Sequence, residues 1–279
     1  MSLPADAEPP RPPGAKMPPR DVADQLFLCE TYPTAFLSTP KCGSTFVKHL
    51  FWQIDHARAH ETATGDGTRI HSFDLDLPRG DRVTLDWVAA SVRTFCIVRE
   101  PADRIFSLYW DKLARTGDRR WAWFRELMAG YEDYAPAPET PAEHRRNCEI
   151  MVEWIGANLR GETEVRLNNH WRPQQMRINM ARTLSLKALP LDRLEDRLVV
   201  LLGDLIPDLR AQMDVVGARN VVPRAVPADE MTTDWLKELI GSLYWADAAA
   251  WEEAQAGWAA LDLSRPDPEA VPRFETPYV

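Results

Sequence analysis

Short apolar runs alternate along this chain with longer segments in which apolar residues recur at helical spacing. Strand character is strongest at residues 34–39 (TAFLST), 94–98 (TFCIV) and 182–189. The second run is β-branched and aromatic, as expected for a strand that is buried on both faces of a sheet. Apolar spacings of three and four residues predict helices at 46–54, 105–113, 119–129, 143–159, 194–205 and 235–261. Strands that alternate with helices form βαβ units, so the pattern predicts a three-layer α/β fold with a central, mostly parallel sheet flanked by helices.

The folded part is expected to be a single domain at residues 22–263. Residues 1–21 hold seven prolines and few large apolar side chains. They cannot bury enough surface to offset their chain entropy, so they are predicted to form a disordered tail. Residues 264–279 are again Pro-rich and are expected to lie over the surface in an extended form.

The composition narrows the classes of function. The formal net charge of −9 argues against non-specific nucleic-acid binding, for which a basic stripe is expected. No stretch approaches about 18 consecutive apolar residues, and no apolar secretory segment opens the chain, so we expect neither a membrane span nor secretion. The four cysteines show no CxxC pair, which favours reduced thiols, a cytoplasmic location and no zinc site.

The most informative segment is residues 36–54, FLSTPKCGSTFVKHLFWQI, in which a strand leads through a tight loop into an amphipathic helix. The first turn of a helix has unsatisfied N–H groups and a partial positive charge, so it attracts a phosphate-like anion. The loop adds an ammonium group, a glycine that permits close backbone approach and two hydroxyls. The residues of this loop are Lys41, Cys42, Gly43, Ser44 and Thr45. Lys41 precedes Gly43 by two residues, unlike the GxxxxGK[ST] loop of nucleotide hydrolases. The segment indicates either a phosphate or sulfate site or a capped helix with a solvated lysine.

A second strand, at 94–98, runs into VREP and then into a helix with the sequence ADRIFSLYWDKL. Arg99 is expected at the C-terminal edge of a parallel strand, where ligands of open α/β sheets bind. Its planar guanidinium fits phosphate oxygens, and Ser107, eight residues further, offers a hydroxyl. The alternatives are an ion pair of Arg99 with Glu100 or Asp103, and a plain surface hydroxyl at Ser107.

Taken together, the two segments resemble the PAPS-dependent sulfotransferases. PKCGST is similar to that family's 5′-phosphosulfate loop, and VREPADRIFSLYWDKL is similar to its 3′-phosphate motif VRDPxxRxxSxYxxK, with Glu100 in place of Asp. NNHWRPQQ at 168–175 resembles the HWRPQ signature of the carbohydrate-sulfotransferase branch, sulfotransferase family 2. LDRLEDRL and LYWADAAAWE are looser similarities, so the resemblance extends from about residue 35 to residue 251.

The resemblance implies a P-loop-like nucleotide-binding fold, a donor, a reaction and residue roles. The donor is 3′-phosphoadenosine 5′-phosphosulfate (PAPS) and the product is adenosine 3′,5′-bisphosphate (PAP). The phosphosulfate lies in the loop of residues 41–45, and Arg99 and Ser107 hold the 3′-phosphate. An acceptor hydroxyl attacks sulfur in line, and Lys41 stabilises the charge that develops on the bridging oxygen. No metal is implied.

A hydroxyl acceptor is helped by a general base. His71, in the segment TRIHSFDLDLP, is one candidate, and the alternatives are a backbone hydrogen bond or a substrate contact. His170 in HWRP is the other candidate catalytic residue. Trp171 and Arg172 beside it are candidate acceptor-binding residues, or else a core residue and a member of an ion pair.

The sequence therefore predicts a sulfotransferase that acts on the hydroxyl of a saccharide, lipid headgroup or small metabolite, without nucleic-acid or integral membrane association. The eukaryotic carbohydrate members carry a membrane anchor and disulfides. Because this sequence predicts neither feature, a bacterial homologue is expected. The alternatives are an ATP-dependent kinase-like phosphotransferase and a non-catalytic protein that binds PAP or PAPS. Trp121 and Trp123 are expected in a helix core rather than on a sugar platform.

Overall fold

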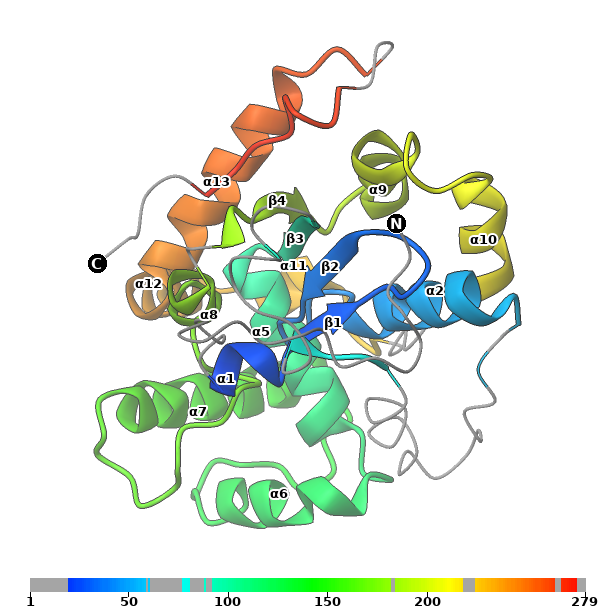
Figure 1. The fold of residues 1–279 in the computed structure, drawn as a ribbon. Coiled ribbons are helices and arrows are strands. Elements are labelled where there is room, and N and C mark those ends of the chain that lie inside the picture. The colour runs from blue at the N-terminus through cyan, green and yellow to red at the C-terminus, as the bar shows by residue number, and fades with distance from the viewer. Residues whose placement is uncertain are drawn as a thin grey trace.

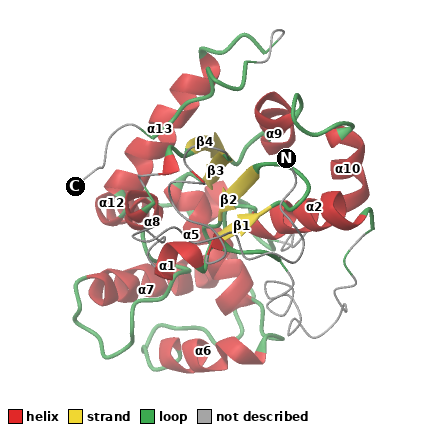
Figure 2. Cartoon of the chain, in the orientation of Figure 1, coloured by secondary structure: helices red, strands yellow, loops and turns green. Residues whose placement is uncertain are grey.

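A four-stranded sheet lies at the centre of the molecule, with helices on both of its faces (Figures 1 and 2). The computed structural model describes residues 20–58, 60, 77–80, 88, 92–181, 184–217, 224–263 and 267–274. The strands are β1 (Leu26–Leu28), β2 (Thr34–Leu37), β3 (Arg93–Val98) and β4 (Lys187–Pro190), in the spatial order β1-β2-β3-β4. Strand β1 is antiparallel to β2, whereas β2, β3 and β4 are parallel. The parallel strands therefore all end at the same edge of the sheet.

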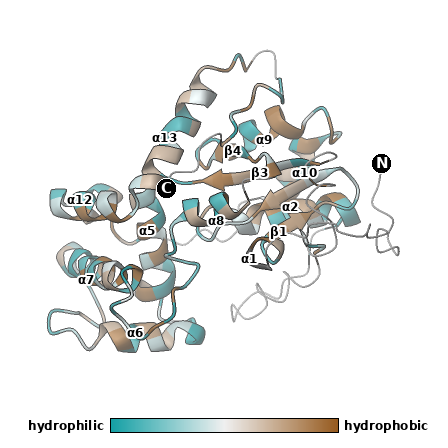
Figure 3. Ribbon diagram, turned by 60° about the vertical axis from the view of Figure 1, so that its left-hand side comes forward, coloured by the Kyte–Doolittle hydropathy of each residue, from teal (hydrophilic) through white to brown (hydrophobic). Residues whose placement is uncertain are grey.

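The alternation of side chains along the strands divides the core between the two faces of the sheet. Phe36 pairs in register with Phe95, and Ile97 with Leu189. These four side chains join one apolar cluster, while the residues between them, such as Cys96, join another. Both faces are buried, as a parallel sheet requires, and the strands are among the most hydrophobic ribbons in Figure 3.

Different helices cover the two faces. Helices α2 (Ser44–His56), α9 (Leu194–Leu202) and α10 (Leu209–Val216) supply the first cluster. Helices α1 (Arg20–Ala23) and α8 (Gln174–Met180) pack into the second. Helix α13 (Trp245–Ala259) packs against β3 and β4 and contributes side chains to both clusters.

A third apolar cluster is formed mainly by helices and lies beyond the ends of the parallel strands. It is built from α5 (Pro101–Tyr109), the π-helical turn Trp110–Ala114, the 3₁₀ turn Arg119–Trp121, α6 (Ala122–Met128), α7 (Pro141–Leu159), α11 (Ala228–Met231) and α12 (Asp234–Leu243). Helix α7 begins with a capping box in which Thr140 and Glu143 exchange hydrogen bonds. This helical layer carries half of the candidate site.

The α/β class with a mostly parallel central sheet is confirmed. The third strand was placed too early, since β4 spans Lys187–Pro190 and residues 182 and 183 lie outside the described part. The short strand β1 was not predicted. The single helix expected at 235–261 is wrong, because α12 and α13 are separated at Tyr244. Tyr244 leaves helical geometry, is buried, and donates a hydrogen bond from its hydroxyl to the Trp171 carbonyl at 2.6 Å.

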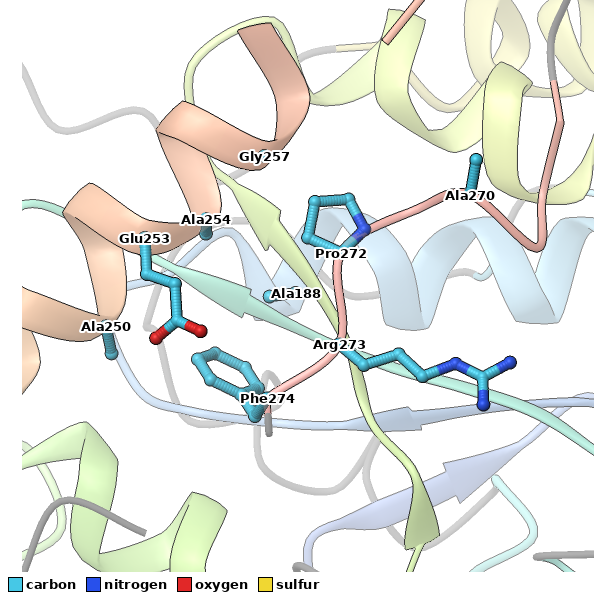
Figure 4. Close-up of a pocket in the computed structure, with 9 residues that line it drawn as sticks. All are labelled: Ala188, Ala250, Glu253, Ala254, Gly257, Ala270, Pro272, Arg273 and Phe274. Atoms are coloured by element: carbon cyan, nitrogen blue, oxygen red, sulfur yellow. The ribbon is translucent and has the colours of Figure 1, made fainter. Parts of the chain in front are cut away.

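The end of the described chain runs beside β4. The amide N–H groups of Ala188 and Phe274 bond to the carbonyls of Pro272 and Leu186, respectively. Between this segment, β4 and α13 lies a cavity of about 250 Å³ (Figure 4). None of the predicted site residues lines this cavity.

No helix in the described part of the chain is both long enough and apolar enough to cross a membrane.

Candidate active site

The two predicted ligand-binding loops meet at the edge where the parallel strands end. The first follows β2, and the second follows β3. Lys41 and Gly43 both adopt left-handed backbone geometry, with φ of 68° and 71°. This is unfavourable for Lys41, so the loop is under backbone strain of the kind found at ligand sites. A Cβ on Gly43 would lie 2.8 Å from Leu191 Cδ1, so glycine serves here both the turn and the packing against the end of β4.

The first turn of α2 presents unused hydrogen-bond donors. Gly43 is its N-cap and provides no side chain to bond the first N–H groups. Within the described part of the chain, the N–H groups of Gly43, Ser44 and Thr45 have no acceptor, and neither serine nor threonine hydroxyl is bonded. Such a row of unbonded donors at a helix N-terminus has the chemistry to bind an anion.

Arg99 connects the second loop to the first. Its Nη1 donates to the carbonyl of Lys41 at 2.9 Å, across 58 residues of sequence. Its Nε is buried and has no partner among the described residues. Burial lowers the pKa of this guanidinium, with smaller effects from neighbouring charges. Arg99 Nη1 therefore holds the backbone of the first loop, while Nε keeps a donor that no described residue uses.

The buried amide of Gln174 fixes the backbone of both loops. Its Oε1 accepts from the Arg99 N–H at 3.2 Å and from the Cys42 thiol at 2.9 Å, and its Nε2 donates to the Arg99 carbonyl at 3.0 Å. Cys42 is fully buried, and burial raises the pKa of its thiol. Cys42 thus faces the core, and only its backbone is available to a ligand.

Arg104 and Asp247 tie these loops to the HWRP segment and to α13. Arg104 donates to the carbonyls of Pro40 at 3.2 Å and Arg172 at 2.9 Å, and lies 3.7 Å from Asp247 Oδ2. Asp247 accepts the N–H groups of Gln174 and Gln175, both at 2.8 Å, and so caps α8. Burial raises the pKa of Asp247, against the opposing attraction of Arg104.

Lys41 forms a buried ion pair with Asp111, at 2.7 Å from Nζ to Oδ2. Lys112 lies 3.0 Å from the same oxygen. Burial raises the pKa of Asp111, but the two lysines together outweigh this and lower it to about 2. Asp111 is therefore ionised at neutral pH.

The second loop is capped by Glu100, the residue that departs from the family motif. Its carboxylate accepts the N–H of Asp103 at 2.6 Å at the start of α5. The longer side chain of Glu100 thus caps α5, as an acidic residue at this position is expected to do. Ser107 is half-buried on α5, and its hydroxyl has no hydrogen-bond partner among the described residues.

His170 lies at the same site and its tautomer is defined by its neighbours. Asn168 Oδ1 accepts the His170 backbone N–H at 2.9 Å and lies 2.8 Å from Nδ1. A backbone N–H can only donate, so the atom between them is an acceptor and Nδ1 must carry the proton. Nε2 then has a free lone pair. Burial, followed by the positive charges of Lys112 and Lys41, lowers the pKa of His170 to about 3.

The structure places Trp171 in the core rather than in an acceptor cleft. Its side chain is fully buried and its Nε1 donates to Asn158 Oδ1 at 2.7 Å. Of the two roles considered for Trp171, that of a core residue applies, because no ring surface is left for a ligand. Arg172 is half-buried, and its carbonyl accepts a hydrogen bond from Arg104. Trp121 is buried against His170 with ring centroids 4.8 Å apart, whereas Trp123 is 39% exposed.

His71, the other candidate base, lies outside the described residues, as do residues 1–19 of the predicted tail. Sequence reasoning gave no role to several residues of the site: Arg104, Asp111, Lys112, Gln174 and Asp247. All five lie within segments that resemble the family, but Asp111 stands at a position that the 3′-phosphate motif leaves unspecified, so only the other four carried a signal. In the part of the chain that the structure describes, no group of three or more His, Cys, Asp or Glu side chains is arranged to hold a metal.

The fold and the two convergent loops define an α/β protein with a cluster of hydrogen-bond donors and positive charges where its parallel strands end. A model of the sulfotransferase family matches residues 24–181, which is more than half of the chain. The chain therefore belongs to the sulfotransferase family. The match supports membership of sulfotransferase family 2. No curated protein and no solved structure matches the chain.

Proposed function

We propose that this protein transfers a sulfuryl group from PAPS to the hydroxyl of an acceptor. The observation that carries the proposal is the hydrogen bond from Arg99 Nη1 to the Lys41 carbonyl, which joins two separate loops into one cationic site. A donor with phosphate groups at both ends of its ribose needs two such anchors at a fixed separation. The family supplies the class of reaction, sulfuryl transfer.

The residues present suit such a donor. The free N–H groups and hydroxyls of Ser44 and Thr45 offer bonds to the phosphosulfate oxygens. The orphaned Nε of Arg99 and the unused hydroxyl of Ser107 offer bonds to the 3′-phosphate. Buried polar atoms without partners are rare in folded proteins, so the unsatisfied Arg99 Nε supports a ligand at this place.

The chemistry follows from the charges at the site. The acceptor oxygen forms a bond to sulfur while the bond from sulfur to the bridging phosphate oxygen breaks, and the electron pair of that bond stays on the phosphate. Lys41 stabilises the negative charge that develops on this oxygen, since a fixed ammonium requires no reorganisation. The proton of the acceptor hydroxyl passes to a base. His170 Nε2, with its free lone pair, is our candidate, and His71 is the alternative.

We propose a saccharide, a lipid headgroup or a small metabolite as the acceptor, and a cytoplasmic location in a bacterium. The four cysteines are buried free thiols, which favours a reducing compartment. A bound metal has no role in the proposed reaction.

Ligand-dependent melting of the full chain, followed by transfer of labelled sulfuryl from PAPS, tests the proposal. PAP is expected to raise Tm and ATP is not, and label is expected to pass to at least one member of an acceptor panel. A rise with ATP alone would replace the proposal with a kinase-like phosphotransferase. A rise with PAP but no loss of PAPS to any acceptor would indicate a non-catalytic binding protein.

A further inference from the structure

One carboxylate oxygen, Asp111 Oδ2, holds two ammonium groups. Lys41 Nζ lies 2.7 Å from it and Lys112 Nζ lies 3.0 Å from it. All three side chains are buried, with exposed fractions of 7% for Lys41, 9% for Asp111 and 8% for Lys112. Asp111 and Lys112 belong to the π-helical turn Trp110–Ala114, a rare geometry that often marks functional positions. The turn directs adjacent residues of the chain to one point beside Lys41.

Among the described residues, the other charged groups with a resolved effect on Lys41, namely Lys112 and Arg99, are positive. Lys41 also acts on the nearby imidazole of His170. Burial lowers the pKa of Lys41, Lys112 and Arg99 lower it further, and Asp111 opposes them. Among the described residues, Asp111 is the only carboxylate in contact with Lys41.

The second lysine has a partner beyond Asp111. Lys112 Nζ lies 3.8 Å from Asp118 Oδ2 and 5.0 Å from the centroid of the Trp121 ring. Asp118 is itself held by the Arg120 guanidinium at 2.9 Å. Lys112 therefore keeps a counter-charge if Asp111 is neutralised, whereas Lys41 does not.

We infer that Asp111 is a positioning residue that holds the ammonium groups of Lys41 and Lys112, and keeps Lys41 protonated, beside the anion-binding loop. Asp111 is not assigned as the base, because its Oδ2 already contacts two ammonium groups. Without it, a desolvated lysine next to other cations loses its proton more easily. The importance of this for turnover rests on the proposed function, because an uncharged Lys41 cannot stabilise the leaving phosphate oxygen.

The inference is tested first without any ligand, in the full chain. The side-chain ¹³Cε resonance of Lys41, assigned by its loss in Lys41→Arg, is titrated in the wild type and in Asp111→Asn. The Lys41 midpoint is expected to move to lower pH by about one pH unit or more in Asp111→Asn. Asp111→Glu keeps a carboxylate and is expected to stay near the wild type. If Asp111→Asn does not fold, Asp111→Ser takes its place as a smaller neutral side chain.

A surface carboxylate provides the matched control. Asp133→Asn removes the exposed partner of Arg146, and the Lys41 midpoint is expected to be unchanged. A midpoint that is the same in the wild type and in the neutral Asp111 variant overturns the inference, as does an equal movement in Asp133→Asn.

Turnover then separates this inference from the proposed function. In an active enzyme, the alkaline limb of the kcat profile is expected to move to lower pH in Asp111→Asn by the same amount as the Lys41 midpoint. A limb that does not move overturns the inference. A wild type that binds no PAP and transfers no label refutes the proposed function, while the Lys41 titration still decides what Asp111 does.

Discussion

Replacement of Arg99 by methionine gives a quantitative test of the second anchor. Arg99→Met keeps the aliphatic stem and removes the guanidinium. In the structure one nitrogen of that guanidinium, Nη1, is already bonded to the Lys41 carbonyl, and Nε is buried and unpartnered. Nε and Nη2 therefore have no hydrogen-bond partner among the described residues, and their N–H groups are available to the oxygens of a 3′-phosphate.

The magnitude follows from those two bonds. A hydrogen bond between charged groups contributes about 1.5–3 kcal/mol, and the half-buried position of Arg99 favours the lower end for each. The loss of both is expected to cost about 3 kcal/mol, which corresponds to a PAP affinity about 100-fold weaker.

Calorimetric titration with two ligands isolates this effect. Adenosine 5′-monophosphate lacks the 3′-phosphate but still reports any disorder of the first loop that follows from the lost bond to Lys41. Arg99→Met is expected to weaken PAP far more than adenosine 5′-monophosphate. Arg146→Met, which removes a guanidinium paired with Asp133 on the surface of α7, is expected to alter neither. Equal losses for the two ligands in Arg99→Met would refute the assignment of Arg99 to the 3′-phosphate.

Three further predictions concern the loop and the candidate base. Lys41→Met is expected to lower kcat by about 100-fold or more and to change PAP affinity much less, and equal changes in rapid-mixing and calorimetric data would contradict a transition-state role. Because the pKa of His170 in the folded protein is about 3, its imidazole is neutral above that pH. The pH profile of kcat/KM is therefore expected to show no acidic limb near pH 6.5 that depends on His170. An acidic limb near pH 6.5 that is kept in His170→Gln would assign the base to another group such as His71. Gly43→Ala is expected to lower the free energy of unfolding by about 1–2 kcal/mol, because φ is +71° and the new methyl meets Leu191, and an unchanged urea midpoint would contradict this.

The two loops of the candidate site were predictable because each is a local unit. A strand, a short loop and a helix are all encoded within about twenty consecutive residues, and the periodicity of each is visible in the sequence. Arg99 and the first loop were also expected at the same edge, since parallel strands end together. The structure places them there, with β2 and β3 as direct neighbours.

The contacts that the two loops make with residues distant in the sequence were not predictable from the same patterns. The Lys41–Asp111 pair spans 70 residues, and the contacts of Asp247 with Gln174 and Gln175 span more than 70. Nothing in local periodicity distinguishes an aspartate that pairs with a loop lysine from one on a solvated helix face. The role of Trp171 was open for the same reason, because burial depends on which helices cover a ring.

By itself, the sequence determined the α/β class, the order of the main strands and helices, and the two loops that meet at one edge of the sheet. Those features follow from hydrophobic periodicity and turn chemistry, which act over a few residues. Only the tertiary structure decided that Asp111 faces Lys41 and that Gln174, itself held by Asp247, forms hydrogen bonds to both loops. It also decided that the helix ends at Tyr244, whose ring is buried. These depend on packing between distant segments, where the free energy of burying or pairing a group is set by neighbours that the local sequence does not specify.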